Sequence, residues 1–220
     1  MKYGESAFDI LYLLTAIVAG LLILGKARNR TEKWMGLAVL ILGCGDAFHL
    51  VPRVLNYFLD ADLTAALGIG KLVTSITMTV FYVLLYHIGC AYCGEKEQRS
   101  VRAAVYALAV LRVLVCLFPQ NGWLRNDSGM LWGILRNLPF VALGLLVLLF
   151  YYRRRAQAGR LRRLWLWILL SFAFYLPVAF FAGVLPLLGM LMLPKTICYI
   201  VMIVVFYRAV TRDEARPEAA

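Results

Sequence analysis

The sequence predicts an all-α protein with seven membrane-spanning helices, built as a single domain over residues 1–210 with a short disordered tail at 211–220. Three observations predict this class. Hydrophobic residues make up 63% of the 220 residues and charged residues only 16%, which is too apolar for an ordinary soluble domain. The apolar residues form runs of about 17–25, enough for a helix to cross about 30 Å of hydrocarbon. The basic residues gather in alternate connections between these runs.

The seven apolar runs account for most of the chain. They cover residues 8–25, 34–58, 65–90, 101–118, 130–151, 162–184 and 187–209. The connections between them are short, and the longest one on the predicted outer side, 118–129, contains Pro, Gly, Asn and Asp, which favour turns. The sequence therefore leaves no room for a soluble catalytic or signalling domain within it.

The uneven distribution of Lys and Arg predicts the orientation in the membrane. Sixteen basic residues fall in the connections after the first, third, fifth and seventh runs or at the adjoining ends of the runs, whereas the opposite connections carry only Lys2 and Arg125. Cytoplasmic loops are enriched in Lys and Arg, so we predict an outside N-terminus and a cytoplasmic C-terminus in a bacterial-type inner (plasma) membrane. This distribution also explains the net charge of +11 through contacts with membrane lipids, and we expect no nucleic-acid partner.

The first three runs and the last three show signs of duplication. Lys71 and Lys195 are 124 residues apart, as are Gly20 and Gly144. The stretch F-H-L-V-P at 48–52 is also similar to F-Y-L-P at 174–177. We therefore expect two parallel three-helix repeats joined by the fourth helix, an arrangement that some carriers use.

Five basic residues lie inside the predicted spans. They are Arg53, Lys71, Arg112, Arg136 and Lys195. A rise of about 1.5 Å per residue places all five roughly 6–13 Å below the outer membrane boundary. Such groups cost about 2.5–3.5 kcal/mol each on insertion scales and usually face a polar interior. Because only Asp9 and Asp46 are expected nearby, we predict a surplus of positive charge that water or an anion must compensate.

Helical spacing favours an outward-facing cavity around these cations. Asp46, His49 and Arg53 lie at i, i+3 and i+7, so they form one stripe. Pro52, Pro139, Pro177 and Pro194 fall beside polar residues, and proline frees carbonyls that can line a wet cavity. The predicted ligand-binding residues are Arg53, Lys71, Ser75, Arg112, Arg136, Tyr175, Lys195 and Tyr199. The alternative is that the cations reach the outer interface or bind backbone carbonyls.

The stretch G-D-A-F-H-L-V-P-R, residues 45–53, adds a catalytic hypothesis. Asp46, desolvated near His49, is suited to act as the general base for a water molecule while nearby cations bind a phosphate. The alternative is structural: Asp46 pairs with Lys195 or Arg53 and locks the bundle.

This stretch, together with L-L-Y-H at 84–87, resembles the G-D-A-x-x-L-x-P-R motif of bacterial lysoplasmalogenase-like (YhhN) membrane proteins. The likeness covers less than a fifth of the chain. It implies hydrolysis of the alkenyl ether of lysoplasmalogens, with Asp46 as the residue carried over. The chain departs from that family in two ways, because it has seven predicted spans rather than eight and no second intramembrane aspartate late in the sequence.

Two further hypotheses concern Lys195 and the cysteines. Seven helices and a lysine on the last one resemble microbial rhodopsins, which implies a retinal Schiff base on Lys195, but the run 65–90 has no carboxylate to act as counterion. His87, Cys90 and Cys93 are spaced i, i+3, i+6, but a closed zinc site needs four ligands. We therefore expect neither a metal nor a cofactor, and we interpret the five cysteines as buried, apolar thiols.

Taken together, these patterns predict an integral membrane protein whose cationic pocket binds an anionic amphiphile similar to a lysophospholipid. Hydrolysis by Asp46 and His49 is an added hypothesis. The main alternative is a carrier or receptor for a small anionic solute; retinal binding through Lys195 and a purely structural role are the others.

Overall fold

The computed structural model describes residues 2–94, 98–181 and 185–211. Within these residues every regular element is a helix, and seven helices are long and apolar enough to cross a membrane. They are α1 (Lys2–Lys26), α2 (Arg30–Phe58), α3 (Thr64–Tyr92), α4 (Arg99–Leu117), α5 (Gly129–Arg153), α6 (Leu164–Phe181) and α7 (Met192–Thr211). Four 3-10 helices join them: η1 (Pro119–Asn121), η2 (Trp123–Arg125), η3 (Gly159–Leu161) and η4 (Pro186–Leu191). The predicted all-α class with seven potential spans is confirmed.

The observed bounds differ most from the predicted ones at the start of the first helix, where α1 begins six residues early, and at the start of the last helix. The run 187–209 was expected to be one helix, but its first residues form η4, and α7 begins only at Met192. Pro194 stands in the first turn of α7, where its missing N–H is tolerated. Residues 182–184 of the predicted sixth span and 212–220 of the predicted tail lie outside the described residues.

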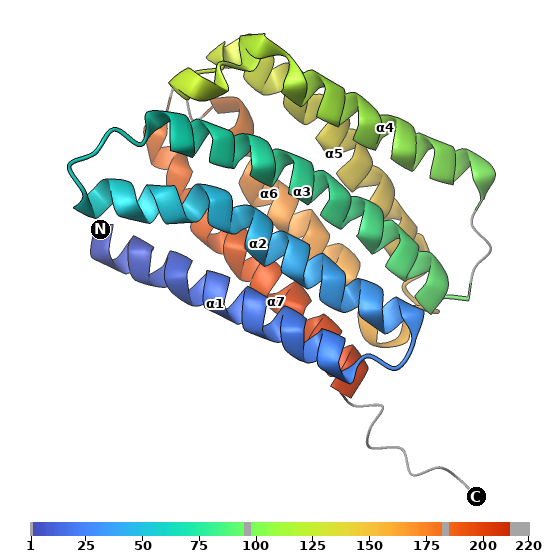
Figure 1. Cartoon of the computed structure of the whole chain (residues 1–220). Coiled ribbons are helices and arrows are strands. Elements are labelled where there is room, and N and C mark those ends of the chain that lie inside the picture. Colours follow the sequence, from blue (N-terminus) through green and yellow to red (C-terminus); the bar gives the residue numbers. More distant parts are fainter. Residues whose placement is uncertain (1, 95–97, 182–184, 212–220) are drawn as a thin grey trace, which may run out of the picture.

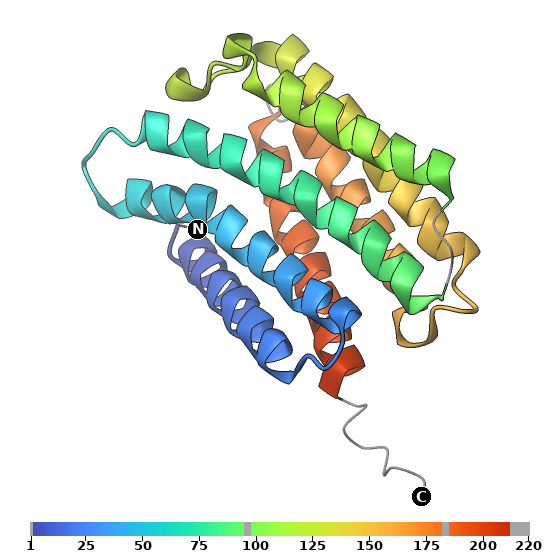
Figure 2. The ribbon, with the colours of Figure 1, turned by 45° about the vertical axis from the view of Figure 1, so that its right-hand side comes forward.

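The helices pack in chain order and form a closed ring. Each helix contacts the next one along the chain, and α1 also contacts α7. Figure 1 shows α1, α2 and α3 side by side, with α6 and α7 behind them. Both views place α1 and α4 on opposite sides of the bundle (Figure 1, Figure 2). Because successive helices alternate in direction, α1 begins at one end of the bundle and α7 finishes at the other (Figure 1).

Small residues bring α1 and α2 close together. A Cβ atom added at Gly20 would meet Leu40, and one added at Gly36 would meet Leu24. Small residues at helix contacts are typical of membrane bundles, where close backbone approach replaces the hydrophobic effect. Asn29 caps α2 by accepting a hydrogen bond from the Glu32 N–H over 2.9 Å. The α1–α2 hairpin is therefore fixed both along its length and at its turn.

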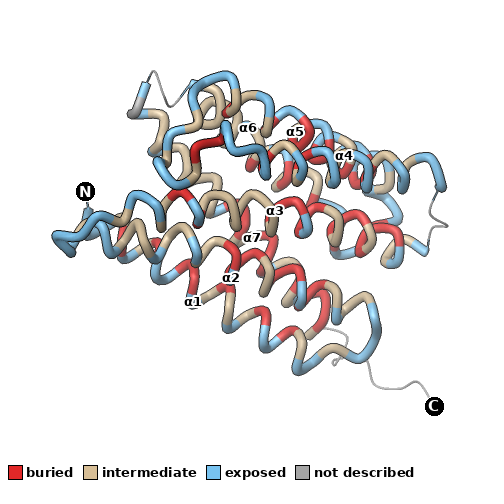
Figure 3. Tube along the Cα trace, turned by 45° about the horizontal axis from the view of Figure 1, so that its top comes forward, coloured by how far each residue is buried: buried red, intermediate tan, exposed pale blue. Residues whose placement is uncertain are grey.

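The most completely buried side chains lie in the half of the bundle next to the basic connections. Eight of them are at most 1% exposed: Tyr82, Leu85, Tyr86, Ile88, Leu143, Val147, Ile168 and Phe206. Figure 3 shows the buried segments, in red, mostly away from the end where the N-terminus lies. Towards that end, residues 71–77 of α3 and 174–180 of α6 are only partly buried. This loosely filled half contains the candidate site.

The cysteines only partly match the expectation of buried thiols. All five are free; Cys90, Cys116 and Cys198 are buried, Cys93 is partly buried and Cys44 is exposed. Cys44 follows Gly43, which packs against α1, so the next residue of α2 points away from that contact.

Candidate functional site

A cavity of about 660 Å³ lies in the half of the bundle that contains the N-terminus. Residues of α1, α2, α3, α5, α6 and α7 line it, together with the connection between α4 and α5. Its charged residues and histidine are Glu5, Asp9, Asp46, His49, Arg53, Lys71, Asp127, Arg136 and Lys195. The cavity therefore gathers the polar residues that the sequence places at one depth on several helices.

Eight of the ten predicted site residues line this cavity. They are Asp46, His49, Arg53, Lys71, Ser75, Arg136, Tyr175 and Lys195. The other two lie behind the wall. Arg112 is 3% exposed and its guanidinium lies 3.5 Å from the centroid of the Phe140 ring, while Tyr199 is 2% exposed and packs edge-on against Phe81. Arg112 is kept out of the cavity because Phe140 of α5 covers it.

The wall contains two carboxylates that the sequence analysis missed, Glu5 and Asp127. With Asp9 and Asp46 they make four acidic residues, against the four basic residues Arg53, Lys71, Arg136 and Lys195. The expected surplus of positive charge is therefore not present in the described lining. Glu5 was missed because α1 starts six residues before the predicted span, at Lys2. Its spacing of i, i+4 from Asp9 was the signal that could have found it.

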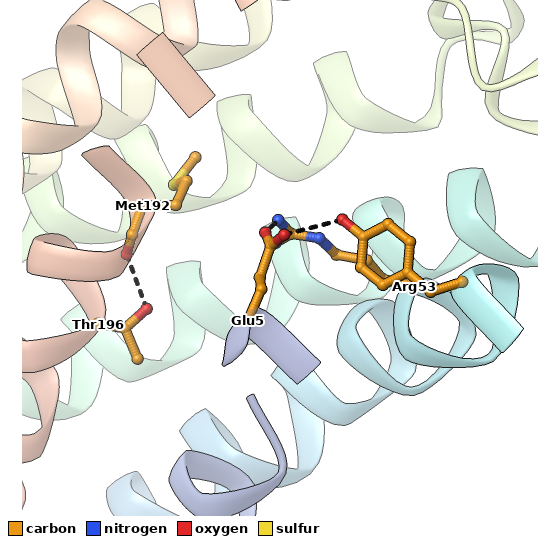
Figure 4. Close-up of polar contacts among 5 residues, drawn as sticks. Glu5, Arg53, Met192 and Thr196 are labelled. Carbon is orange, nitrogen blue, oxygen red and sulfur yellow. Dashed lines mark hydrogen bonds and ion pairs between the residues drawn. The ribbon is translucent and has the colours of Figure 1, made fainter. Parts of the chain in front are cut away.

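Glu5 and Arg53 form an ion pair between α1 and α2 (Figure 4). Tyr57 donates a hydrogen bond to Oε2 of Glu5 over 3.0 Å and so orients the carboxylate. Figure 4 also shows Met192 and Thr196 of α7, where the Thr196 hydroxyl donates to the Met192 carbonyl over 2.9 Å. Arg53 is thus neutralised by Glu5, and the predicted alternative of an Asp46–Arg53 clamp is not what the structure contains.

Asp46 is held by a tyrosine. The Tyr12 hydroxyl, on a side chain that is 1% exposed, donates a hydrogen bond to Oδ2 of Asp46 over 2.6 Å. Lys195 is close enough for its charge to interact with that of Asp46. Its ammonium lies over two rings, 4.9 Å from the centroid of Tyr175 and 5.3 Å from that of Tyr199. In the described part of the chain Asp46 and Lys195 make no direct salt bridge.

Lys71 and Arg136 are held by neutral groups. Lys71 donates a hydrogen bond to Oδ1 of Asn126 over 2.7 Å. Arg136 donates to Oδ1 of Asn121 over 3.3 Å and lies over the Trp123 ring, 4.7 Å from its centroid. Among the described residues, neither cation has a carboxylate in salt-bridge contact. These contacts orient the two side chains but leave their charge uncompensated.

The connection from α4 to α5 positions these neutral partners. The buried Asn121 amide donates to the carbonyls of Val115, Cys116 and Phe118 over 2.7, 3.3 and 3.1 Å. Trp123 donates to the Cys116 carbonyl over 2.7 Å. At Gly68 of α3 any Cβ would collide with the Trp123 carbonyl, so the connection lies directly on α3. The sequence predicted only a turn here, because these bonds depend on where the connection folds back.

Two buried polar atoms of the cavity residues have no hydrogen-bond partner, Oδ2 of Asp9 and Nδ1 of His49. Asp9 is only 4% exposed. A buried acceptor without a donor is costly, by about 1–3 kcal/mol, and a charged one by more. These two atoms are therefore the polar atoms of the cavity residues whose hydrogen bonding the described chain leaves unsatisfied.

One side of the cavity is apolar. Its apolar lining residues include Leu50, Met130, Val178, Ala179, Phe180, Met192 and Leu193, most of them on α6 and α7. Tyr175 interrupts this side and donates a hydrogen bond to Oδ1 of Asn137 over 2.6 Å. The cavity thus combines charged residues on α1, α2, α3, α5 and α7 with apolar residues that lie mostly on α6 and α7.

In the described part of the chain, the cysteine and histidine residues near the basic end are not grouped as metal ligands. His87 is within hydrogen-bond distance of the Tyr106 hydroxyl, at 2.9 Å, and its ring lies against Trp34. Over the described residues, no three His, Cys, Asp or Glu side chains are grouped so that they could hold a metal ion.

No family model, no curated protein and no solved structure matches this chain. The similarity of residues 45–53 to lysoplasmalogenase-like proteins stays a prediction from the sequence.

Proposed function

We propose that the protein binds an amphiphile with an anionic head group in this cavity. The main support is that Lys71, Arg136 and Lys195 line it with only neutral or aromatic groups in direct contact among the described residues. A cation without a partner in a region of low dielectric constant is costly, and a phosphate or carboxylate offsets that cost through charge-assisted hydrogen bonds.

The apolar residues that line the cavity favour an amphiphile over a small ion as the ligand. A volume of about 660 Å³ is within the usual range for sites that bury a drug-sized molecule, and far more than a single phosphate fills. The residues of α6 and α7, such as Phe180 and Leu193, offer apolar contact. A lysophospholipid placed with its phosphate at Lys71 and Arg136 and its chain along these apolar residues uses both surfaces.

We place the cavity on the outer side of a bacterial-type inner membrane. The connections that carry most basic residues, after α1, α3 and α5, join the helix ends opposite the cavity. Positive loops favour the cytoplasmic side, so the cavity faces outwards in this orientation. It would then receive its ligand from the outer leaflet or from the outside solution.

Hydrolysis is a second step that this site supports. Asp46 and His49 both line the cavity, as a base that activates water must do to reach a bound substrate. In the reaction implied by the resemblance to lysoplasmalogenase-like proteins, water adds across the alkenyl ether, and the products are an aldehyde and a free glycerol hydroxyl. Asp46→Asn should then abolish release of the aldehyde from a lysoplasmalogen while leaving its binding measurable; unchanged turnover would exclude Asp46 as the base.

A carrier or receptor for a small anionic solute is the alternative function. The predicted parallel repeat favours it. Lys71 and Lys195 occupy corresponding positions in the two predicted repeats, and both line the cavity. The equivalent glycines also pack alike, since a Cβ at Gly20 would meet Leu40 of the next helix and one at Gly144 would meet Phe172 of the next helix. Counterflow of a labelled organic anion in proteoliposomes would support a carrier. The absence of counterflow would argue against a carrier and favour the binding of an anionic amphiphile.

Retinal binding through Lys195 is a more distant alternative. One observation favours it: Asp46 on α2 is near enough to Lys195 for their charges to interact, so Asp46 is a candidate for the counterion that α3 lacks. Added retinal should then give a red-shifted absorbance band that Lys195→Ala removes. If the absorbance spectrum remains that of free retinal, retinal is not attached to Lys195.

Native mass spectrometry of the purified protein tests the main proposal. We expect a bound anionic lipid that is lost in Lys71→Met and in Arg136→Met, because both variants keep the apolar stem and remove the charge. Arg125→Met is the matched control, since Arg125 is exposed on the same α4–α5 connection and does not line the cavity. A spectrum without lipid, or equal retention in all variants, would overturn the proposal.

A further inference from the structure

We infer that the head group bound in the cavity carries an ammonium group as well as an anion, and that Asp9 binds the ammonium. The inference rests on the proposed function, because it concerns the same cavity and the same ligand. It names a second subsite, on a different helix from Lys71 and Arg136, that the anionic part of the ligand does not use.

Asp9 differs from the other carboxylates that α1 and α2 place in the wall. Glu5 is paired with Arg53 and accepts a hydrogen bond from Tyr57, and Asp46 accepts one from Tyr12. Asp9 is 4% exposed, lines the cavity, and its Oδ2 atom has no hydrogen-bond partner among the described residues. Asp9 is thus a buried carboxylate in the cavity wall with one oxygen that lacks a donor, which a ligand N–H group supplies.

Asp9 and Asp46 also come from different helices than the two cations held by neutral groups. The carboxylates of Asp9 and Asp46 come from α1 and α2, whereas Lys71 and Arg136 come from α3 and α5. Lys71 and Arg136 are near enough for their charges to interact with each other. A head group that carries only negative charge would share the cavity with Asp9 and Asp46, and like charges there weaken binding. A head group with one charge of each sign matches both pairs of residues.

An ammonium fits Asp9 better than a metal ion does. No three His, Cys, Asp or Glu side chains are grouped for metal binding within the described residues, so Asp9 has too few co-ligands. A primary ammonium has three N–H donors and needs only one or two acceptors. It can therefore pair with Asp9 and leave the remaining donors for Asp46 or for water.

Two lysolipids with the same acyl chain test this inference. Purified protein in detergent should bind lysophosphatidylethanolamine about tenfold more tightly than lysophosphatidylglycerol, because only the first has an ammonium to pair with Asp9. Tenfold corresponds to about 1.4 kcal/mol, the size of one hydrogen bond to a charged group. Asp9→Asn should bring the two affinities together and still bind lysophosphatidylglycerol, which also shows that the variant is folded. Asp127→Asn, a change at another wall carboxylate, should keep the tenfold preference.

The outcomes separate the inference from the proposed function. If neither lysolipid binds, the proposed function fails and the inference fails with it. If both bind equally to the unaltered protein, or if Asp9→Asn keeps the preference, only the inference is wrong. Lysophosphatidylcholine, whose ammonium has no N–H, should bind more weakly than the ethanolamine lipid. If soluble phosphoethanolamine competes with the bound lysolipid, the ligand is a free zwitterion. If only another lysolipid competes, the ligand is a membrane lipid.

Discussion

The two halves of this bundle are built from the same helices but in different ways. In the half near the basic connections, α3 presents Tyr82, Leu85 and Tyr86, each at most 1% exposed. In the other half, the same helix presents Lys71, Thr74 and Ser75 to a cavity of about 660 Å³. The comparison indicates that one half holds the bundle together and the other is free to bind a ligand.

A layer of aromatic rings separates the two halves. Tyr82 packs edge-on against Phe140 and Phe172, with ring centroids 5.1 and 5.5 Å apart. Phe140 also packs against Tyr175, which lines the cavity, with centroids 5.7 Å apart. Edge-to-face pairs of this kind fix ring orientation and add about 0.5–1.5 kcal/mol each. This layer gives the polar cavity a rigid floor.

The comparison is most directly tested with one phenylalanine from each half. Phe206→Ala, at a side chain that is 0% exposed, should lower the free energy of unfolding by about 3–5 kcal/mol, because it leaves a void in the packed half. Phe180→Ala should lower it far less, because Phe180 is partly buried and already faces the cavity. Thermal unfolding in detergent measures both changes, and equal losses would show that the halves are equally well packed.

The hydrogen bond from Tyr12 to Asp46 tests whether the polar half also contributes to stability. Tyr12→Phe removes a buried charge-assisted bond of 2.6 Å and should cost about 2 kcal/mol. Tyr57→Phe is the matched control, since its bond to Glu5 is 3.0 Å long and lies beside a partly exposed ion pair, so a much smaller loss is expected. If Tyr12→Phe has no effect, Asp46 is not held as the structure indicates.

Gly70 tests how tightly α2 and α3 are joined beside the cavity. A Cβ there would collide with the backbone of Phe48 and His49, whereas one at Gly25 would meet nothing within 4 Å. Alanine gains up to about 1 kcal/mol of helix propensity over glycine, and overpacking costs about 1–3 kcal/mol. Gly70→Ala should therefore lower the melting temperature slightly, and Gly25→Ala should raise it. A stabilised Gly70→Ala variant would mean that α2 and α3 can separate at this end.

The smallest effect is expected at Asp62, outside the spans. Hydrogen bonds from the Thr64 side chain and backbone N–H hold the pKa of Asp62 below its usual 3.8. Because the pKa is lower in the folded state, the stabilisation is present above the unfolded value and is lost as the pH falls through the folded one. Asp62→Ala should melt slightly below the unaltered protein at pH 7, and the difference should vanish at acid pH. A difference that persists there would need another cause.

The sequence predicted the helices well because the relevant signal is local. Length and hydropathy are properties of each run by itself, and they place seven spans within a few residues of the observed ones except at the starts of α1 and α7. Depth along a helix is also fixed by residue number. For this reason the sequence could place Arg53, Lys71, Arg136 and Lys195 at one level before their contacts were known.

The charge balance of the site was decided only by tertiary structure. Glu5 and Asp127 belong to the wall because α1 starts early and the α4–α5 connection folds back over α3, and neither fact is encoded by hydropathy. Arg112 falls outside the wall because α4 packs behind Phe140. Helical periodicity states which residues share a face of one helix, but which faces meet depends on how all seven helices pack. The sequence thus determined the spans and the depth of the polar layer, and the packing decided which of those charges face one another.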